Sequence, residues 1–212
     1  AIPIVVFGLI AINILVFVYQ AMLAGQGAGE QFIFSYGVVP GRFGLDPFGE
    51  AYTLISSQFL HGGFMHILGN MLYLYIFGDN VEDRFGHAGF LIFYLVCGAC
   101  AALAQIYFNQ ESAIPMVGAS GAIAGVLGAY FIFYPRARVL TLIPLGVFSR
   151  MIEIPAFFFL GFWFLMQTFS GTAALYTART MGREVGGVAW WAHAGGFVAG
   201  LAAALIKGRR RD

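Results

Sequence analysis

A serine and a histidine, each next to an apolar segment, could act together in catalysis. Ser120 stands in the run Gly118-Ala119-Ser120-Gly121, ahead of the apolar segment 122–134, and His193 stands near the start of another apolar segment, 190–206. A histidine beside a serine can accept the hydroxyl proton and turn the serine into an effective nucleophile. Each residue alone also has a simpler interpretation, the serine as a helix cap and the histidine as a hydrogen-bonded interior group.

A second polar pair could supply hydrogen-bond donors to a reaction. His66 and Asn70 are four residues apart and therefore share one face of a helix. Both side chains can donate hydrogen bonds, and donors aimed at one point suit a developing oxyanion. The alternative interpretation is a polar pair that holds two helices together.

Metal and redox sites are disfavoured. His61 and His66 have no carboxylate or third ligand near them in the sequence, and the H-E-x-x-H motif is absent. Cys97 and Cys100 lie in an apolar segment without polar partners, and we expect them to be small core residues. The sequence therefore predicts no metal and no cofactor.

The composition is that of a membrane protein. Hydrophobic residues make up 60% of the 212 residues and charged residues 10%, and the mean hydropathy is +0.82. Soluble domains average about 25% charged residues. The length fits a single domain over residues 1–212, and the net charge of +1 gives no support for nucleic-acid binding. Because the chain starts at Ala1 inside a hydrophobic run and without an initiator Met, we expect a truncated N-terminus.

Six apolar segments are candidate membrane spans, each of which needs about 20 residues, or about 17 at the low end. They are 2–23, 65–78, 90–108, 120–134, 154–170 and 190–207. The second and fourth are short, so one end of each should lie below the membrane surface and within protein. The pattern predicts an all-α bundle of six transmembrane helices. A long first extracytoplasmic loop, 25–64, would lie in the interface as short amphipathic turns.

The basic residues indicate the orientation of these spans. Of the 11 Lys and Arg residues, eight lie in the segments that face inward if the N-terminus is cytoplasmic: Arg84, Arg136, Arg138, Arg150, Lys207, Arg209, Arg210 and Arg211. The outward segments hold the other three, Arg42, Arg179 and Arg183. This excess predicts two cytoplasmic termini and places Ser120 and His193 towards the extracytoplasmic side. We also expect His87 to be solvated in a cytoplasmic loop.

Small residues predict how the two polar residues meet. Gly196 and Gly200 follow His193 at i+3 and i+7, and the segment after Ser120 carries a matching row, Gly121, Gly125 and Gly128. Glycines at this spacing let membrane helices pack at close backbone distance. Packing alone would explain these glycines. If the two rows do pack together, they would also bring Ser120 and His193 within hydrogen-bond range.

Taken together, these motifs resemble those of the rhomboid family of intramembrane serine proteases, in its compact six-span prokaryotic type. The resemblance rests on the run 61–70, on Gly118-Ala119-Ser120-Gly121 and on 192–200, in the family's order along the chain. It implies that Ser120 is the nucleophile and His193 its general base. One difference is visible. Some members carry a Trp-Arg pair where this chain has Tyr52-Thr53, which bears on how the first loop is held.

The resemblance also implies supporting roles. The oxyanion hole would consist of His66, Asn70 and the Ser120 N–H, Gly118 would shape the loop before the serine, and His61 would brace the first loop. Glu82 would be a structural acid at a helix end.

The expected function is cleavage of peptide bonds in or near transmembrane helices of membrane-protein substrates, by a Ser-His dyad in the cell (inner) membrane. Partners would be these substrates and the lipid bilayer. An inactive rhomboid-like protein that binds transmembrane helices is the alternative, and a small transporter is disfavoured because neither inverted repeats nor a ring of charges is visible. The aromatic run 157–164 could form a movable side gate, although a lipid-facing or packing role explains it as well.

Overall fold

The computed structural model describes residues 2–145, 148–181 and 187–208. Ala1, Arg183, Arg209, Arg210 and Arg211 lie outside the described residues. Helices run over Ile4–Gly25 (α1), Gly29–Tyr36 (α2), Pro40–Leu45 (α3), Thr53–Ser56 (α4), Ser57–Phe59 (η1, a 3-10 turn), Phe64–Phe85 (α5), His87–Phe108 (α6), Ser120–Phe133 (α7), Ala156–Met181 (α8) and Trp190–Lys207 (α9). Between α7 and α8 lie the strands Arg138–Leu145 (β1) and Phe148–Pro155 (β2).

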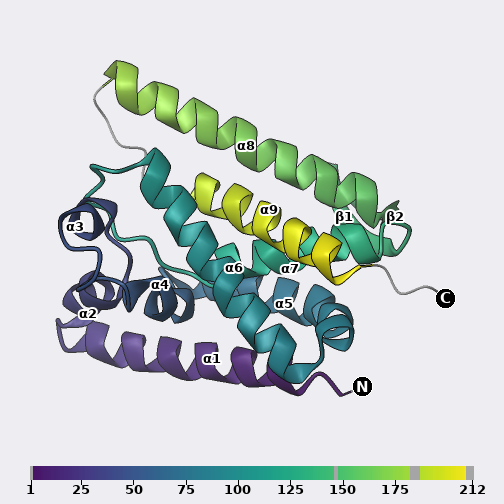
Figure 1. Ribbon diagram of the computed structural model, residues 1–212, viewed down its shortest axis with the longest axis horizontal. Coiled ribbons are helices and arrows are strands. Elements are labelled where there is room, and N and C mark those ends of the chain that lie inside the picture. The colour runs from purple at the N-terminus through teal and green to yellow at the C-terminus, as the bar shows by residue number, and fades with distance from the viewer. Residues whose placement is uncertain (1, 146–147, 182–186, 209–212) are drawn as a thin grey trace.

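Helix α7 is the centre of a helical bundle. Every residue from Gly121 to Tyr130 is buried, whereas α1 and α8 lie on opposite outer sides of the bundle (Figure 1). Large apolar side chains such as Leu15 on α1 and Phe162 on α8 point outward and are exposed. By length and composition, three of the described helices could cross a membrane, namely Ile4–Gly25, His87–Phe108 and Ala156–Thr180. This arrangement, apolar both inside and outside, is typical of a membrane protein.

The close packing of α7 against α9 that the glycines predict is confirmed. A side chain added at Gly196 would collide with the backbone oxygen of Gly121, and one added at Gly200 would collide with that of Gly125. Likewise, Gly128 lies against the backbone of Phe197. The two helix backbones touch over this length, which holds their N-terminal ends together.

Adding a single methyl group to this contact should loosen the bundle. We expect Gly200→Ala to lower stability by about 1–3 kcal/mol, the usual cost of overpacking, because the new Cβ has no space beside Gly125. Thermal unfolding in detergent measures this effect. Gly8→Ala on α1 is the matched control, because nothing lies within 4 Å of that position. Equal unfolding midpoints for Gly200→Ala and the unchanged protein would contradict the packing argument.

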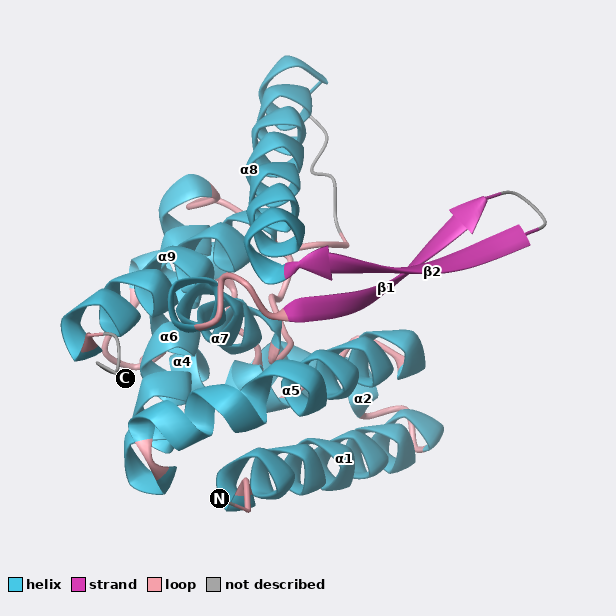
Figure 2. Ribbon diagram, turned by 90° about the vertical axis from the view of Figure 1, so that its right-hand side faces the viewer, coloured by secondary structure: helices cyan, strands magenta, loops and turns pink. Residues whose placement is uncertain are grey.

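The expectation of an all-α fold is wrong in one segment. Strands β1 and β2 pair antiparallel, with Arg138 opposite Pro155 and Leu142 opposite Met151, and this hairpin projects sideways from the bundle (Figure 2). The fifth span was expected to begin at residue 154, but Ile154 belongs to β2 and α8 begins after Pro155. A proline disfavours the helical conformation of the residue before it, which explains why α8 starts after Pro155.

Helix α5 is longer than its apolar stretch. It was expected to end at residue 78, but it continues to Phe85 and ends at Gly86, which has a φ of +75°. Its last turns are stabilised by contacts to other helices. Glu82 is 2% exposed and accepts hydrogen bonds from the backbone N–H groups of Val5 (3.0 Å) and Val6 (2.8 Å), at the start of α1. Of the two helices expected to be short, only α7 is short.

Two smaller expectations are also corrected. His87 is exposed as expected, but it begins α6 instead of lying in a loop, and its Nδ1 lies 2.5 Å from Glu82 Oε1. Cys97 is buried in the core as expected, but Cys100 is exposed.

The first loop contains more regular structure than short turns. It holds α2, α3, α4 and η1, which gather at the end of the bundle where α9 begins (Figure 1). Val38 pairs in a β-bridge with Met116, shortly before α7. Arg42 donates to the carbonyl of Phe34 (2.7 Å) and forms an ion pair with Glu50 (2.7 Å), and the Tyr52 hydroxyl donates to the carbonyl of Ser35 (2.7 Å). These contacts hold the loop in place without a Trp-Arg pair.

Candidate active site

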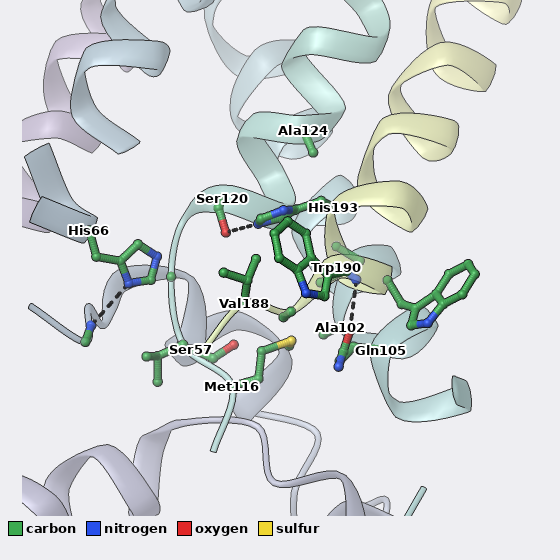
Figure 3. A pocket seen from close by; sticks show the side chains of 18 of the residues that line it. Ser57, His66, Ala102, Gln105, Met116, Ser120, Ala124, Val188, Trp190 and His193 are labelled. Atoms are coloured by element: carbon green, nitrogen blue, oxygen red, sulfur yellow. Dashed lines mark hydrogen bonds between the residues drawn. The ribbon is translucent and has the colours of Figure 1, made fainter. Parts of the chain in front are cut away.

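Ser120 and His193 meet where α7 and α9 begin. Ser120 is the first residue of α7, and His193 lies in the first turn of α9. His193 Nε2 and Ser120 Oγ are 2.8 Å apart, and the two side chains point towards each other (Figure 3). The predicted contact is therefore present. At this distance the imidazole can accept the hydroxyl proton, the first requirement for a nucleophilic serine.

Gly118 makes the turn that presents Ser120. Its φ of +129° lies in a region that side chains with a Cβ rarely adopt. Its N–H donates to the carbonyl of Ser57 (2.9 Å), which ties the turn to the first loop. A methyl group at this position would also lie 2.7 Å from His66 Nε2. Both the backbone conformation and the available space therefore require glycine here.

His66 and Asn70 face the same turn from α5. His66 Nδ1 accepts from the N–H of Gly62 (3.3 Å), which leaves the ring proton on Nε2, the atom that faces Gly118. Asn70 Nδ2 is buried, faces Gly118 as well, and has no hydrogen-bond partner among the described residues. Two N–H donors thus converge beside the turn that carries Ser120.

The backbone N–H of Ser120 is a third donor at this point. A helix leaves its first N–H groups without an intrahelical acceptor, and Ser120 is the first residue of α7. Together the three groups could stabilise an oxyanion formed next to Ser120 Oγ.

A cavity of about 1210 Å³ gives access to these groups. Ser120, His193, His66 and Asn70 all line it, together with Trp190 and other residues of α6, α8 and α9 (Figure 3). Its volume leaves space for water and for an extended peptide segment beside the serine.

His61 lies behind this site rather than in it. Its ring is 1% exposed, and its centroid lies 5.2 Å from that of His66. Burial, with a smaller contribution from the neighbouring His66, lowers the pKa of His61 to about 4, so this ring is neutral at neutral pH. Its backbone N–H and carbonyl both bond to the Gln20 side chain on α1, at 3.0 and 3.1 Å. His61 therefore connects the first loop to α1 through its backbone.

A partner for the second nitrogen of His193 was not predicted from the sequence. The apolar segments contain no acidic residue that could orient the imidazole, so a dyad of Ser120 and His193 without a third residue was expected. In the structure Gln167 Oε1 on α8 lies 2.7 Å from His193 Nδ1. The one sequence signal for this contact was an amide side chain, Gln167, within the largely apolar run 162–169.

The aromatic run 157–164 divides between two environments. Phe158 and Phe162 are each 66% exposed and point away from the bundle. Trp163 and Phe164 instead pack on the ring of Phe197 on α9, with centroids 6.1 and 4.8 Å away. The outward phenylalanines fit the lipid-facing interpretation.

Comparison with known proteins agrees with this architecture. The sequence matches the Rhomboid domain family over residues 49–210. It is 40% identical over 81 residues to the Rhomboid protease GluP of Bacillus subtilis, a match that covers 38% of this chain and 15% of that protein. RHOMBOID-like protein 5 of Arabidopsis thaliana is 38% identical over 81 residues, covering 38% of this chain and 26% of that protein. RHOMBOID-like protein 12 (mitochondrial) of the same plant is 29% identical over 204 residues, covering 88% of this chain and 57% of that protein.

Proposed function

The chain belongs to the rhomboid family, and we propose that it is an intramembrane serine endopeptidase that cuts peptide bonds in or near the transmembrane helices of other membrane proteins. The contact of 2.8 Å between Ser120 Oγ and His193 Nε2, beside the cavity, is the observation that carries this proposal.

The proposed mechanism assigns each polar group a step. Ser120 Oγ attacks the substrate carbonyl while His193 Nε2 takes its proton, and the same imidazole then protonates the leaving amine. The negative charge on the carbonyl oxygen would be stabilised by the Ser120 N–H and the donors of His66 and Asn70. Water then attacks the acyl-enzyme while His193 Nε2 takes its proton, and the imidazole returns this proton to Ser120 Oγ, which releases the second product and regenerates the serine.

The substrate follows from where the serine lies. A transmembrane helix pairs all its backbone groups internally, so its scissile bond must be exposed by local unwinding before attack. Targets with Gly or Pro near the cut would unwind most easily. Membership of the rhomboid family favours a small residue just before the scissile bond.

The membrane arrangement is part of this proposal. Helices α1, α5, α6, α7, α8 and α9 would be the six spans of a single domain over residues 1–212, in the cell (inner) membrane. Both termini would be cytoplasmic and the cavity would open to the extracytoplasmic side. Because α7 has only 14 residues, its first residue would lie below the membrane surface, where water can reach it only through the cavity.

Covalent labelling tests the proposed nucleophile without any knowledge of the natural substrate. A fluorophosphonate should label the folded protein once, on Ser120, and heat-denatured protein should not react, because the reaction needs the His193 contact. Ser120→Ala should abolish the label, whereas Ser149→Ala, an exposed serine on the hairpin, should leave it unchanged. The alternative of an inactive protein that only binds helices would be favoured if wild type and Ser120→Ala gave the same signal.

A further inference from the structure

Gln167 is a buried polar residue on α8 with exposed apolar residues on either side of it in the chain. Its side chain is 8% exposed, whereas its neighbours Leu165 and Phe169 are 65% and 70% exposed. Burying an amide among apolar groups is costly unless its polar atoms are hydrogen-bonded. Its Oε1 lies 2.7 Å from His193 Nδ1 on α9. Thr168 and Thr172 on α8 donate to carbonyls of their own helix, whereas the bond from Gln167 connects α8 to another helix.

The chemistry of this contact determines the state of the imidazole. An amide oxygen can only accept a hydrogen bond, so the proton of neutral His193 must sit on Nδ1. The lone pair is then on Nε2, the nitrogen that faces Ser120 Oγ. The opposite tautomer would point an N–H at the serine and could not take its proton.

The aromatic neighbours of His193 limit how its ring can turn. The Trp163 ring lies 5.8 Å from it at 32°, and the Trp190 ring lies 6.4 Å away at 85°. These contacts restrict the ring plane but do not select a tautomer. Only the polar contact with Gln167 does so.

We propose that Gln167 is a positioning residue that holds His193 in the tautomer and orientation needed to deprotonate Ser120. The proposal rests on the proposed protease function. Because Gln167 belongs to α8, the imidazole would be held in this way only while α8 is packed against α9. Any movement of α8 that admits a substrate would release the imidazole until the helix returns.

Two substitutions separate positioning from packing. Gln167→Met keeps the size of the side chain and removes the acceptor, so we expect kcat to fall between about 10-fold and about 100-fold with KM unchanged. Fluorophosphonate labelling should slow by a similar factor. Gln167→Glu keeps an acceptor and adds a charge that stabilises the imidazolium, so most activity should return. The acidic limb of its pH–rate profile should then move to higher pH by about one unit or more.

The surroundings of His193 make that pH shift interpretable. The other titratable side chains among the described residues lining the cavity are His66 and Tyr73, both on α5. Both remain unchanged in the two variants. Thr168→Val is the matched control, because it removes a polar group from the same helix without touching His193. Thermal unfolding in detergent establishes that each variant is folded.

The possible results distinguish this proposal from the protease assignment. Wild-type rates for Gln167→Met, with an inactive Ser120→Ala, would overturn the positioning role alone. Equal losses of activity in Gln167→Met and Gln167→Glu, with no shift of the acidic limb of the pH–rate profile, would mean that Gln167 acts only in packing. That result would also overturn the positioning role. Cleavage by Ser120→Ala would refute the protease function, and the positioning role with it.

Discussion

Ser120→Ala is expected to lower cleavage of a model transmembrane substrate by more than about 10⁴-fold, to the level of the background. His193→Ala should cost about as much, because the hydroxyl and the imidazole act as one unit across the 2.8 Å contact. The Ser120→Ala, His193→Ala double variant should therefore be no slower than either single variant. Turnover of a purified substrate in detergent or in vesicles measures all three.

Ser149→Ala and Gly8→Ala are the controls for this comparison, since both positions lie outside the site. Equal amounts of product from wild type, Ser120→Ala and His193→Ala would refute the proposed mechanism. Additive losses in the double variant would show that the two residues act separately, which the geometry does not allow.

The site could be predicted from the sequence because its signals are local. The glycine rows after Ser120 and His193 can be read directly, and close packing of small residues leaves one way for α7 and α9 to align. His66 and Asn70 share a helix face through their spacing alone. Once the order of the helices is fixed, these residues must gather at one end of the bundle.

The parts that the sequence did not predict depend on tertiary contacts. The segment 138–155 carries Arg138 and Arg150, so all but its last two residues were expected to be a cytoplasmic connection, and no strand was predicted in it. Pro155 was the one local signal for the boundary. The extension of α5 depends on Glu82, whose partners at Val5 and Val6 are more than 70 positions away in the chain.

The contact of Gln167 with His193 was not predicted, because it too depends on tertiary packing. In the sequence it is one amide in an apolar helix, and its partner depends on how α8 is rotated about its axis. That rotation is set by the packing of Trp163 and Phe164 on Phe197. Only the assembled bundle shows that this face of α8 points at His193.

Asn70→Ala is expected to lower kcat by about 10²–10³-fold while KM stays close to the wild-type value. The buried Nδ2 of Asn70 has no hydrogen-bond partner among the described residues, and it faces the turn next to Ser120. A donor left unpaired in the resting protein can gain its hydrogen bond when charge develops on the substrate oxygen. Its loss should therefore raise the barrier without weakening substrate binding. His66→Ala should behave in the same way.

The matched control for this prediction is Asn80→Ala, which removes the same side chain from the same helix near its other end, where the amide bonds to Asp79. Steady-state kinetics on one substrate give kcat and KM for each variant. A rise in KM with unchanged kcat would mean that Asn70 binds the substrate in its ground state. A loss of activity that tracks a lower unfolding temperature would mean that Asn70 and His66 only hold helices together. The oxyanion assignment requires a stable protein with low kcat and unchanged KM.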